Sequence, residues 1–224
     1  MSRILARGVL VLLVLIFGGV LASRFRTSAA VTIGDPVVDN SLAPTSGQKT
    51  VVLAGGCFWG MQLVFEHVKG VVSATAGYSG GSAATARYET VSTGETGHAE
   101  SVRIVYDHSK VTFGTLLKVF FSVAHDPTEL NYQGPDEGTQ YRSVIFYADD
   151  DQRRIASAYI AQLDGAKVFR HRIVTQLTPL IAFYPAEAYH QDFAIHNPND
   201  PYIVFNDLPK LEHLRKELPD LYVK

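Results

Sequence analysis

The chain has 224 residues, a formal net charge of −2, 46% hydrophobic residues and 11% aromatic residues. This composition excludes a disordered protein and predicts a packed globular domain with a sizeable core. Lys and Arg together number 20 against 22 Asp and Glu, so the charge gives no reason to expect nucleic acid as a partner.

The first thirty residues differ from the rest. An uncharged apolar run over 8–22 is flanked on each side by two arginines, Arg3 and Arg7 before it and Arg24 and Arg26 after it. A positive segment followed by such a run is typical of a signal peptide, and the run is short for a membrane span, which takes about 20 residues. We therefore expect 1–30 to be a signal peptide or an N-terminal membrane anchor. The domain is then exported, periplasmic or otherwise extracytoplasmic, with an inner-membrane tether if the segment stays uncleaved.

The rest of the chain divides into three parts. Residues 31–49 mix small and polar residues with two prolines and show no sustained period, which predicts a linker. Residues 50–200 carry the alternating strand and helix patterns of a folded domain. Residues 201–224 form a C-terminal tail whose leucines predict a short helix that ends before Pro219.

The stretch VVLAGGCFWGM, at 51–61, contains the only cysteine. An apolar run, two glycines and then apolar residues at helical spacing predict a strand, a tight turn and a helix. Cys57 then lies at the helix N-terminus, where free N–H groups and the helix dipole stabilise a thiolate. Because glycines admit a close ligand, and two aromatic rings follow, we predict that Cys57 is a nucleophile rather than a structural thiol.

The later patterns predict strands over 70–78, 100–107, 143–147 and 172–177, helices that begin after Thr112 and after Asp149 or Asp150, and long loops over 82–98 and 125–140. Helices interleaved with few strands predict an α+β fold. We expect a two-layer sandwich, in which a mixed sheet with a ferredoxin-like core has its helices packed on one face.

A nucleophilic thiol needs an acid or base partner. Glu100 shares the alternation phase of Val102 and Ile104, so its carboxyl can face the apolar interior, where desolvation raises its pKa and keeps it protonated as a general acid. An exposed glutamate at a strand start is the alternative. Tyr88 and Tyr141 can each donate a phenolic hydrogen bond, or be ordinary amphipathic edge residues.

The residues alone do not decide the roles of four further polar residues. Asp136 lies between a proline and a glycine, as a turn residue would. His98, His125 and His190 are candidate bases or ligands, but none has a partner at metal-ligand spacing, so we expect no metal.

Four ordered motifs together resemble the peptide methionine sulfoxide reductases of the A type. They are Gly56-Cys57-Phe58-Trp59-Gly60, Gly97-His98-Ala99-Glu100, Gly138-Thr139-Gln140-Tyr141-Arg142-Ser143 and Tyr189-His190-Gln191-Asp192. The resemblance runs from about residue 50 to about residue 198. It implies an α+β sandwich that reduces the S epimer of methionine sulfoxide, free or in peptides, without a metal or an organic cofactor.

The resemblance also implies roles for single residues. Cys57 matches the nucleophile that becomes a sulfenic acid, and Glu100 matches the acid that protonates the sulfoxide oxygen. Tyr88 and Tyr141 match the phenols that bind this oxygen. The substrate-binding residues are Phe58 and Trp59, which receive the methyl group, together with Asp136 and His190.

This sequence departs from the family pattern in its tail. Many relatives carry a second cysteine there that resolves the sulfenic acid, and residues 201–224 contain none. We therefore expect an external thiol reductant, such as a thioredoxin-like or glutaredoxin-like protein, to act on a monomer. Tyr132 also replaces a basic residue common in relatives, which alters the pocket rim or the partner surface.

Two other classes of protein fit parts of the pattern. A Cys–His acyl-transfer enzyme would use Cys57 with His98 or His190, but it leaves Glu100 and the two tyrosines without a role. A membrane-tethered binding domain would use Cys57 as a structural thiol. A dithiol oxidoreductase is excluded, because the sequence has one cysteine.

Overall fold

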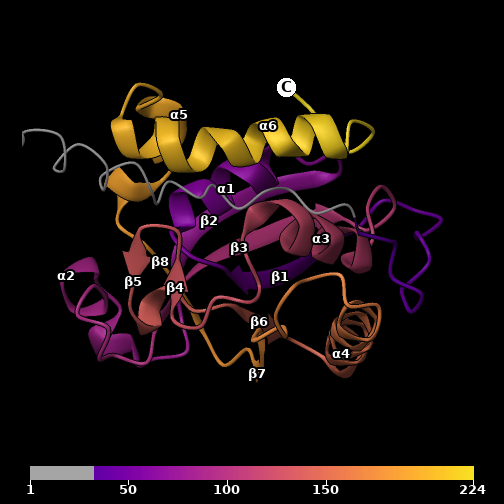
Figure 1. Cartoon of the computed structure of the whole chain (residues 1–224), viewed down its shortest axis with the longest axis horizontal. Coiled ribbons are helices and arrows are strands. Elements are labelled where there is room, and N and C mark those ends of the chain that lie inside the picture. Colours follow the sequence, from indigo (N-terminus) through magenta and orange to yellow (C-terminus); the bar gives the residue numbers. More distant parts are fainter. Residues whose placement is uncertain (1–32) are drawn as a thin grey trace, which may run out of the picture.

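The fold is seen in a computed structural model that describes residues 33–224. At its centre is a six-stranded sheet of order β7-β6-β1-β3-β2-β8 (Figure 1). Its strands are β1 (Gln48–Ala54), β2 (Val71–Ser79), β3 (Ala99–Asp107), β6 (Val144–Tyr147), β7 (Gln176–Pro179) and β8 (Phe183–Pro185). Two short strands, β4 (Tyr132–Gln133) and β5 (Asp136–Glu137), form a separate pair.

The helices are α1 (Phe58–Glu66), α2 (Tyr88–Val91), α3 (Phe113–Val119), α4 (Asp150–Gly165), α5 (Phe193–His196) and α6 (Leu208–Glu217). Thr112 caps α3 by accepting from the N–H of Thr115, and Asp149 caps α4 by accepting from the N–H of Gln152. Within the described part of the chain, none of the helices combines the length and the apolar character needed to cross a membrane. The predicted signal peptide or anchor, 1–30, lies outside the described residues.

The four inner strands confirm the predicted ferredoxin-like core. Strand β1 is antiparallel to both β3 and β6, and β3 is antiparallel to β2. Helix α1 connects β1 to β2, and α3 follows β3 before the chain enters β6, which is the split βαβ arrangement. Strand β7 extends the sheet parallel to β6 after the crossover helix α4, and β8 adds an antiparallel strand beside β2.

Alternation along the strands separates two apolar faces. One face packs against α1, α3 and α4, and its buried residues include Val51, Leu53, Val102, Ile104 and Ile145. The other face carries Val52, Ala54, Val144 and Phe146, covered by Leu180 and Phe183 of the β7–β8 segment. Helix α6 lies against α1 in the outer part of the helical layer (Figure 1). The helices therefore cover a single face of the sheet.

The predicted linker, 31–49, is packed on the domain over its described residues. Ile33 is 5% exposed, and Asp35 forms an ion pair with Lys118 at 2.7 Å. Asp39 accepts from the N–H of Gly114 at 2.9 Å, at the start of α3. Asp39 binds there because the first turn of a helix has free N–H groups that need acceptors. Together the three contacts hold the segment on the domain.

The predicted tail, 201–224, is also part of the domain. Leu214 of α6 is fully buried, and the bridge between Val68 and Tyr222 ties the chain end to the end of α1. An apolar helix face must be covered, and α6 covers the outer side of α1.

Two strands differ from the sequence prediction. The strand expected over 172–177 begins only at Gln176, because Val174 donates its N–H to Pro127 of a loop instead of pairing in the sheet. Strand β8 was not predicted, since it has three residues and is defined by its pairing with β2.

Candidate active site

Cys57 is the residue before the first turn of α1 and is 8% exposed. Gly56 has φ +91°, a conformation that favours glycine, and a Cβ there would lie 2.7 Å from the side chain of Gln133. A Cβ on Gly55 would lie 2.8 Å from the ring of His125. The two glycines therefore let the 125–133 loop pack directly against the backbone before the cysteine.

The environment of the Cys57 thiol differs from the sequence prediction. Burial, followed by the nearby carboxyls of Glu100, Asp207 and Asp136, raises the pKa of Cys57 well above its usual value. The N–H of Trp59 acts in the opposite direction. The prediction that the helix N-terminus stabilises a thiolate is therefore wrong for the free protein. The cost of burying a charged sulfur exceeds the stabilisation that the helix N-terminus gives it. The resting group is a thiol.

Glu100 is buried beside this helix start, with 3% of its surface exposed. Its Oε2 accepts a hydrogen bond from the N–H of Phe58 at 3.0 Å. Burial raises the pKa of the carboxyl to about 8, although the bond from Phe58 lowers it. At neutral pH Glu100 is therefore mainly a carboxylic acid, which is the protonation state that a proton donor needs.

Tyr88 begins α2 and Tyr141 ends a short helical turn before β6. Burial raises the pKa of both phenols, and Glu100, Cys57 and Asp136 raise it further when they are ionised. Both hydroxyls therefore keep their hydrogens at neutral pH. Both tyrosines interact electrostatically with the thiol and the carboxyl because they lie near them.

Aromatic rings surround His190 on one side of the site. Its ring centroid lies 5.0 Å from that of Phe58 and 4.6 Å from that of Tyr88. The Trp59 indole N–H donates to Nδ1 of His190 at 3.2 Å, and Trp59 stacks on Phe193 at 3.8 Å. Because Nδ1 accepts, the neutral ring carries its hydrogen on Nε2, which is buried without a partner among the described residues.

Asp136 lies next to this aromatic group through Tyr202. The Tyr202 hydroxyl donates to Oδ2 of Asp136, and the Tyr202 ring meets Trp59 edge-on at 5.9 Å. Burial raises the pKa of Asp136, against the effect of Tyr202 and Lys210. Tyr202 is a site residue that the sequence did not reveal, since one tyrosine among eleven carries no signal.

Asp207 is a second residue that sequence reasoning missed. It is fully buried, its Oδ1 pairs with Lys210 at 3.2 Å, and its Oδ2 has no partner in the described part of the chain. A Cβ on Gly60 of α1 would lie 2.1 Å from Oδ1. The sequence Asp-Leu-Pro-Lys is typical of an ordinary helix start, so nothing in it predicts that the carboxyl would lie against α1.

The other two histidines have structural contacts. His98 accepts from the N–H of Gly81 at Nδ1, at 3.2 Å, and its Nε2 lies 3.0 Å from the carbonyl oxygen of Ser82. His125 bonds the carbonyl of Phe120 and the hydroxyl of Ser143, at 2.9 and 2.7 Å. Neither has a free ring nitrogen to act as a base. Over residues 33–224 no group of three or more acidic, histidine or cysteine side chains is arranged to hold a metal ion.

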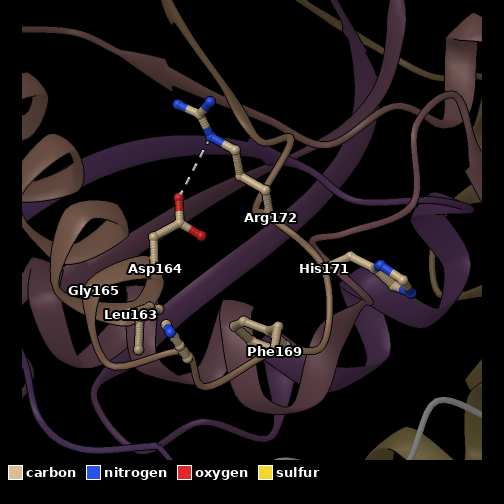
Figure 2. Close-up of a pocket in the computed structure, with 7 residues that line it drawn as sticks. Leu163, Asp164, Gly165, Phe169, His171 and Arg172 are labelled. Carbon is tan, nitrogen blue, oxygen red and sulfur yellow. Dashed lines mark ion pairs between the residues drawn. The ribbon is translucent and has the colours of Figure 1, made fainter.

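A hollow of about 490 Å³ lies elsewhere, where α4 ends (Figure 2). It is lined by Leu163, Asp164, Gly165, Lys167, Phe169, His171 and Arg172. Asp164 and Arg172 form an ion pair across it at 3.9 Å, and the Arg172 side chain is 90% exposed. None of the candidate site residues lines this hollow, so it is not part of the candidate active site.

The structure thus gathers all eight predicted residues around the start of α1. A lone buried thiol, a carboxylic acid and phenolic donors are suited to oxidising cysteine while stabilising charge on a substrate oxygen. This fold and site define a single-cysteine thiol oxidoreductase.

Comparison with known proteins identifies the family. Residues 49–221 match the family model described as "Peptide methionine sulfoxide reductase". "Peptide methionine sulfoxide reductase MsrA 2" of Mesorhizobium japonicum is 60% identical over 185 residues, which cover 83% of this chain and 94% of the relative. A protein of the same name from Synechocystis is 52% identical over 84% of this chain and 89% of its own length.

Solved structures agree. Methionine sulfoxide reductase A of Corynebacterium diphtheriae has a TM-score of 0.59 at 33% identity, covering 78% of this chain and 91% of that one. Reduced Mxr1 from Saccharomyces cerevisiae has a TM-score of 0.63 at 30% identity, covering 76% and 96%. The chain therefore belongs to the peptide methionine sulfoxide reductase family, in its A type. It is an oxidoreductase that uses a thiol to reduce methionine sulfoxide, a reaction of protein repair.

Proposed function

We propose that the chain reduces the S epimer of methionine sulfoxide, free or within peptides and proteins, through a sulfenic acid on Cys57. The observation that carries this proposal is the placement of Glu100: a buried carboxylic acid hydrogen-bonded to the N–H of Phe58, the residue after the cysteine. It puts a proton donor beside the nucleophile in a desolvated site.

The reaction balances with the groups present. The sulfur of Cys57 attacks the sulfoxide, the sulfoxide oxygen moves to it as the S=O bond breaks, and methionine leaves. Cysteine sulfur is oxidised to S–OH and the sulfoxide is reduced to the thioether. Glu100 supplies a proton to the oxygen, and the proton lost by the thiol restores the Glu100 carboxylic acid.

The other residues bind and orient the substrate. The hydroxyls of Tyr88 and Tyr141 donate to the sulfoxide oxygen as charge develops on it. Phe58 and Trp59 enclose the methyl group. His190, fixed by the Trp59 N–H at 3.2 Å, and Asp136, fixed by Tyr202, shape the edge of the pocket. Tyr132, which is 39% exposed, contributes to the pocket rim or to the partner surface.

Regeneration requires an external thiol, because Cys57 has no second cysteine to pair with. The attacking thiol displaces water from the sulfenic acid and forms a mixed disulfide, which a second thiol reduces. We infer a thioredoxin-like or glutaredoxin-like protein as the reductant of a monomeric enzyme.

A single turnover without reductant tests the proposal. Protein lacking residues 1–30 is mixed with each epimer of a methionine sulfoxide, and Cys57 is trapped with a sulfenic-acid reagent for mass spectrometry. We expect one methionine per enzyme and a trapped Cys57 from the S epimer alone. Product from neither epimer, with no adduct, would remove the proposed mechanism.

We further infer that the chain is exported, possessing at 1–30 a signal peptide or membrane anchor. The support is the apolar run at 8–22 between paired arginines. Fusion of residues 1–40 to a reporter enzyme that is active only outside the cytoplasm should give activity, and substitution of Leu12 and Leu13 by Arg should abolish it. A reporter active only in the cytoplasm would contradict export.

A further inference from the structure

Tyr88 is held from a distant part of the chain. It is the first residue of α2, a helix of four residues, and the preceding residue Arg87 provides no side-chain cap. Instead the backbone N–H of Tyr88 donates to Oε1 of Glu187 at 3.0 Å, across 99 residues of sequence. A helix this short has little stability of its own, so this contact contributes to holding Tyr88 in place.

The second carboxylate oxygen of Glu187 reaches the sheet. Oε2 accepts the hydroxyl of Tyr78 at 2.9 Å. Tyr78 is fully buried, and on β2 it is the pairing partner of Glu100 on β3. One carboxylate therefore connects the helix that carries the phenol to the strand beside the carboxylic acid.

The charge of Glu187 strengthens both contacts. Burial acts to raise its pKa, but the N–H of Tyr88, the other hydrogen bonds and His190 outweigh burial, and the pKa lies below its usual value. An ionised acceptor makes shorter and stronger hydrogen bonds than a neutral one. Glu187 also directly precedes the short turn that ends at His190, whose ring lies 4.6 Å from Tyr88.

We propose that Glu187 is a positioning residue for the sulfoxide reduction: its carboxylate fixes Tyr88 relative to Glu100, so that the phenol meets the sulfoxide oxygen as charge develops there. The inference rests on the proposed function, in which Tyr88 is a donor to that oxygen. Glu187 itself does not touch the substrate.

The test is a double-mutant cycle between Glu187→Gln and Tyr88→Phe. Glutamine keeps the size of the side chain but removes its charge: its oxygen can still accept from the N–H of Tyr88, whereas its NH2 group has to donate to the Tyr78 hydroxyl, so the two charge-assisted bonds become weaker neutral ones. Because misplacement of a catalytic group by about 1 Å costs on the order of a hundredfold, we expect E187Q to lower kcat about ten- to a hundredfold. KM should change less than about twofold, since the aromatic wall is untouched.

The decisive result comes in the Tyr88→Phe background. There we expect E187Q to change kcat less than about twofold, because its effect acts through the missing hydroxyl. Glu89→Gln is the matched control, since it removes an exposed charge from the same helix, and it should leave kcat unchanged. Equal losses from E187Q with and without the Tyr88 hydroxyl would overturn the proposal.

Two further outcomes separate this proposal from the function on which it rests. If Y88F turns over like the wild type, Tyr88 is not a donor, and both the assignment and the inference fail. If Y88F is impaired and the E187Q loss is fully additive, only the inference fails. Glu187→Asp, which keeps the charge but shortens its reach, gives the same cycle should E187Q not fold.

Discussion

Replacing Glu100 with glutamine should make the protein more stable and nearly inactive at once. The carboxyl has a pKa of 4.5 as a free group and about 8 in the fold. Below pH 4.5 both states hold the proton and folding bears no penalty. As the pH rises toward 8, the folded state must retain a proton that the unfolded state releases, so stability falls and the loss levels off above about pH 8.

The size of the effect follows from the two pKa values. One pH unit corresponds to about 1.36 kcal/mol, so the penalty is about 1 kcal/mol at pH 5 and about 3 kcal/mol at pH 7. Glutamine has the shape of the protonated acid, can still accept from the N–H of Phe58, and bears no such penalty. We therefore expect Glu100→Gln to be more stable by about 3 kcal/mol at pH 7, which is roughly 6–12 °C in Tm for a domain of this size.

The assay is urea and thermal unfolding of both proteins at pH 5, 6, 7 and 8, with single-turnover rates measured in parallel. Loss of the proton donor should lower the rate on the order of a hundred- to a thousandfold. Glu89→Gln, an exposed neutralisation, should show no gain. A Glu100→Gln protein no more stable than the wild type at pH 7, or a gain that does not shrink toward pH 5, would refute a buried, protonated Glu100.

Three other substitutions test the site and its support. Tyr141→Phe should lower kcat about a hundredfold with little change in KM, because one donor to the sulfoxide oxygen is lost; an unchanged kcat would remove Tyr141 from the site. Lys210→Met should destabilise the protein by about 3–5 kcal/mol at pH 7 by leaving Asp207 buried without a cation, and the loss in urea unfolding should shrink at lower pH as the carboxyl takes up a proton. Gly60→Ala should lower the free energy of unfolding by about 1–3 kcal/mol, because the new Cβ would lie 2.1 Å from Oδ1 of Asp207. Gly165→Ala is the control, since its Cβ would have no atom within 4 Å, and it should change the free energy by less than about 0.5 kcal/mol. Equal effects of the two substitutions would contradict the close packing at Gly60.

Much of the fold follows from interactions between residues that are close together in the sequence. The two glycines before Cys57, the alternation through Glu100 and the caps at Thr112 and Asp149 each act within a few residues, and the corresponding elements were predicted correctly. Strand β8 and helix α2 were not, because each is stabilised by distant partners. Strand β8 pairs with β2, and α2 is held by a carboxylate 99 residues away.

The site shows the same division. The sequence identifies which residue types could react, and the family resemblance assigns them roles. It does not reveal the pKa of Cys57, because that pKa depends on how completely three dispersed segments enclose the thiol. Asp207 illustrates the limit: its neighbours in sequence suggest a helix cap, and only the packing of α6 on α1 places its charge beside the cysteine.

Residues 221–223 pack against the segment that follows α1. Lys69, just after α1, donates its N–H to Leu221 at 2.7 Å, and Val223 donates to His67 at 2.9 Å. During synthesis Cys57 therefore emerges about 150 residues before Asp207, the last in sequence of the three carboxyls near the thiol. We expect the thiol to stay incompletely enclosed until α6 has been synthesised. The enclosure of the thiol is then completed only when α6 packs on α1.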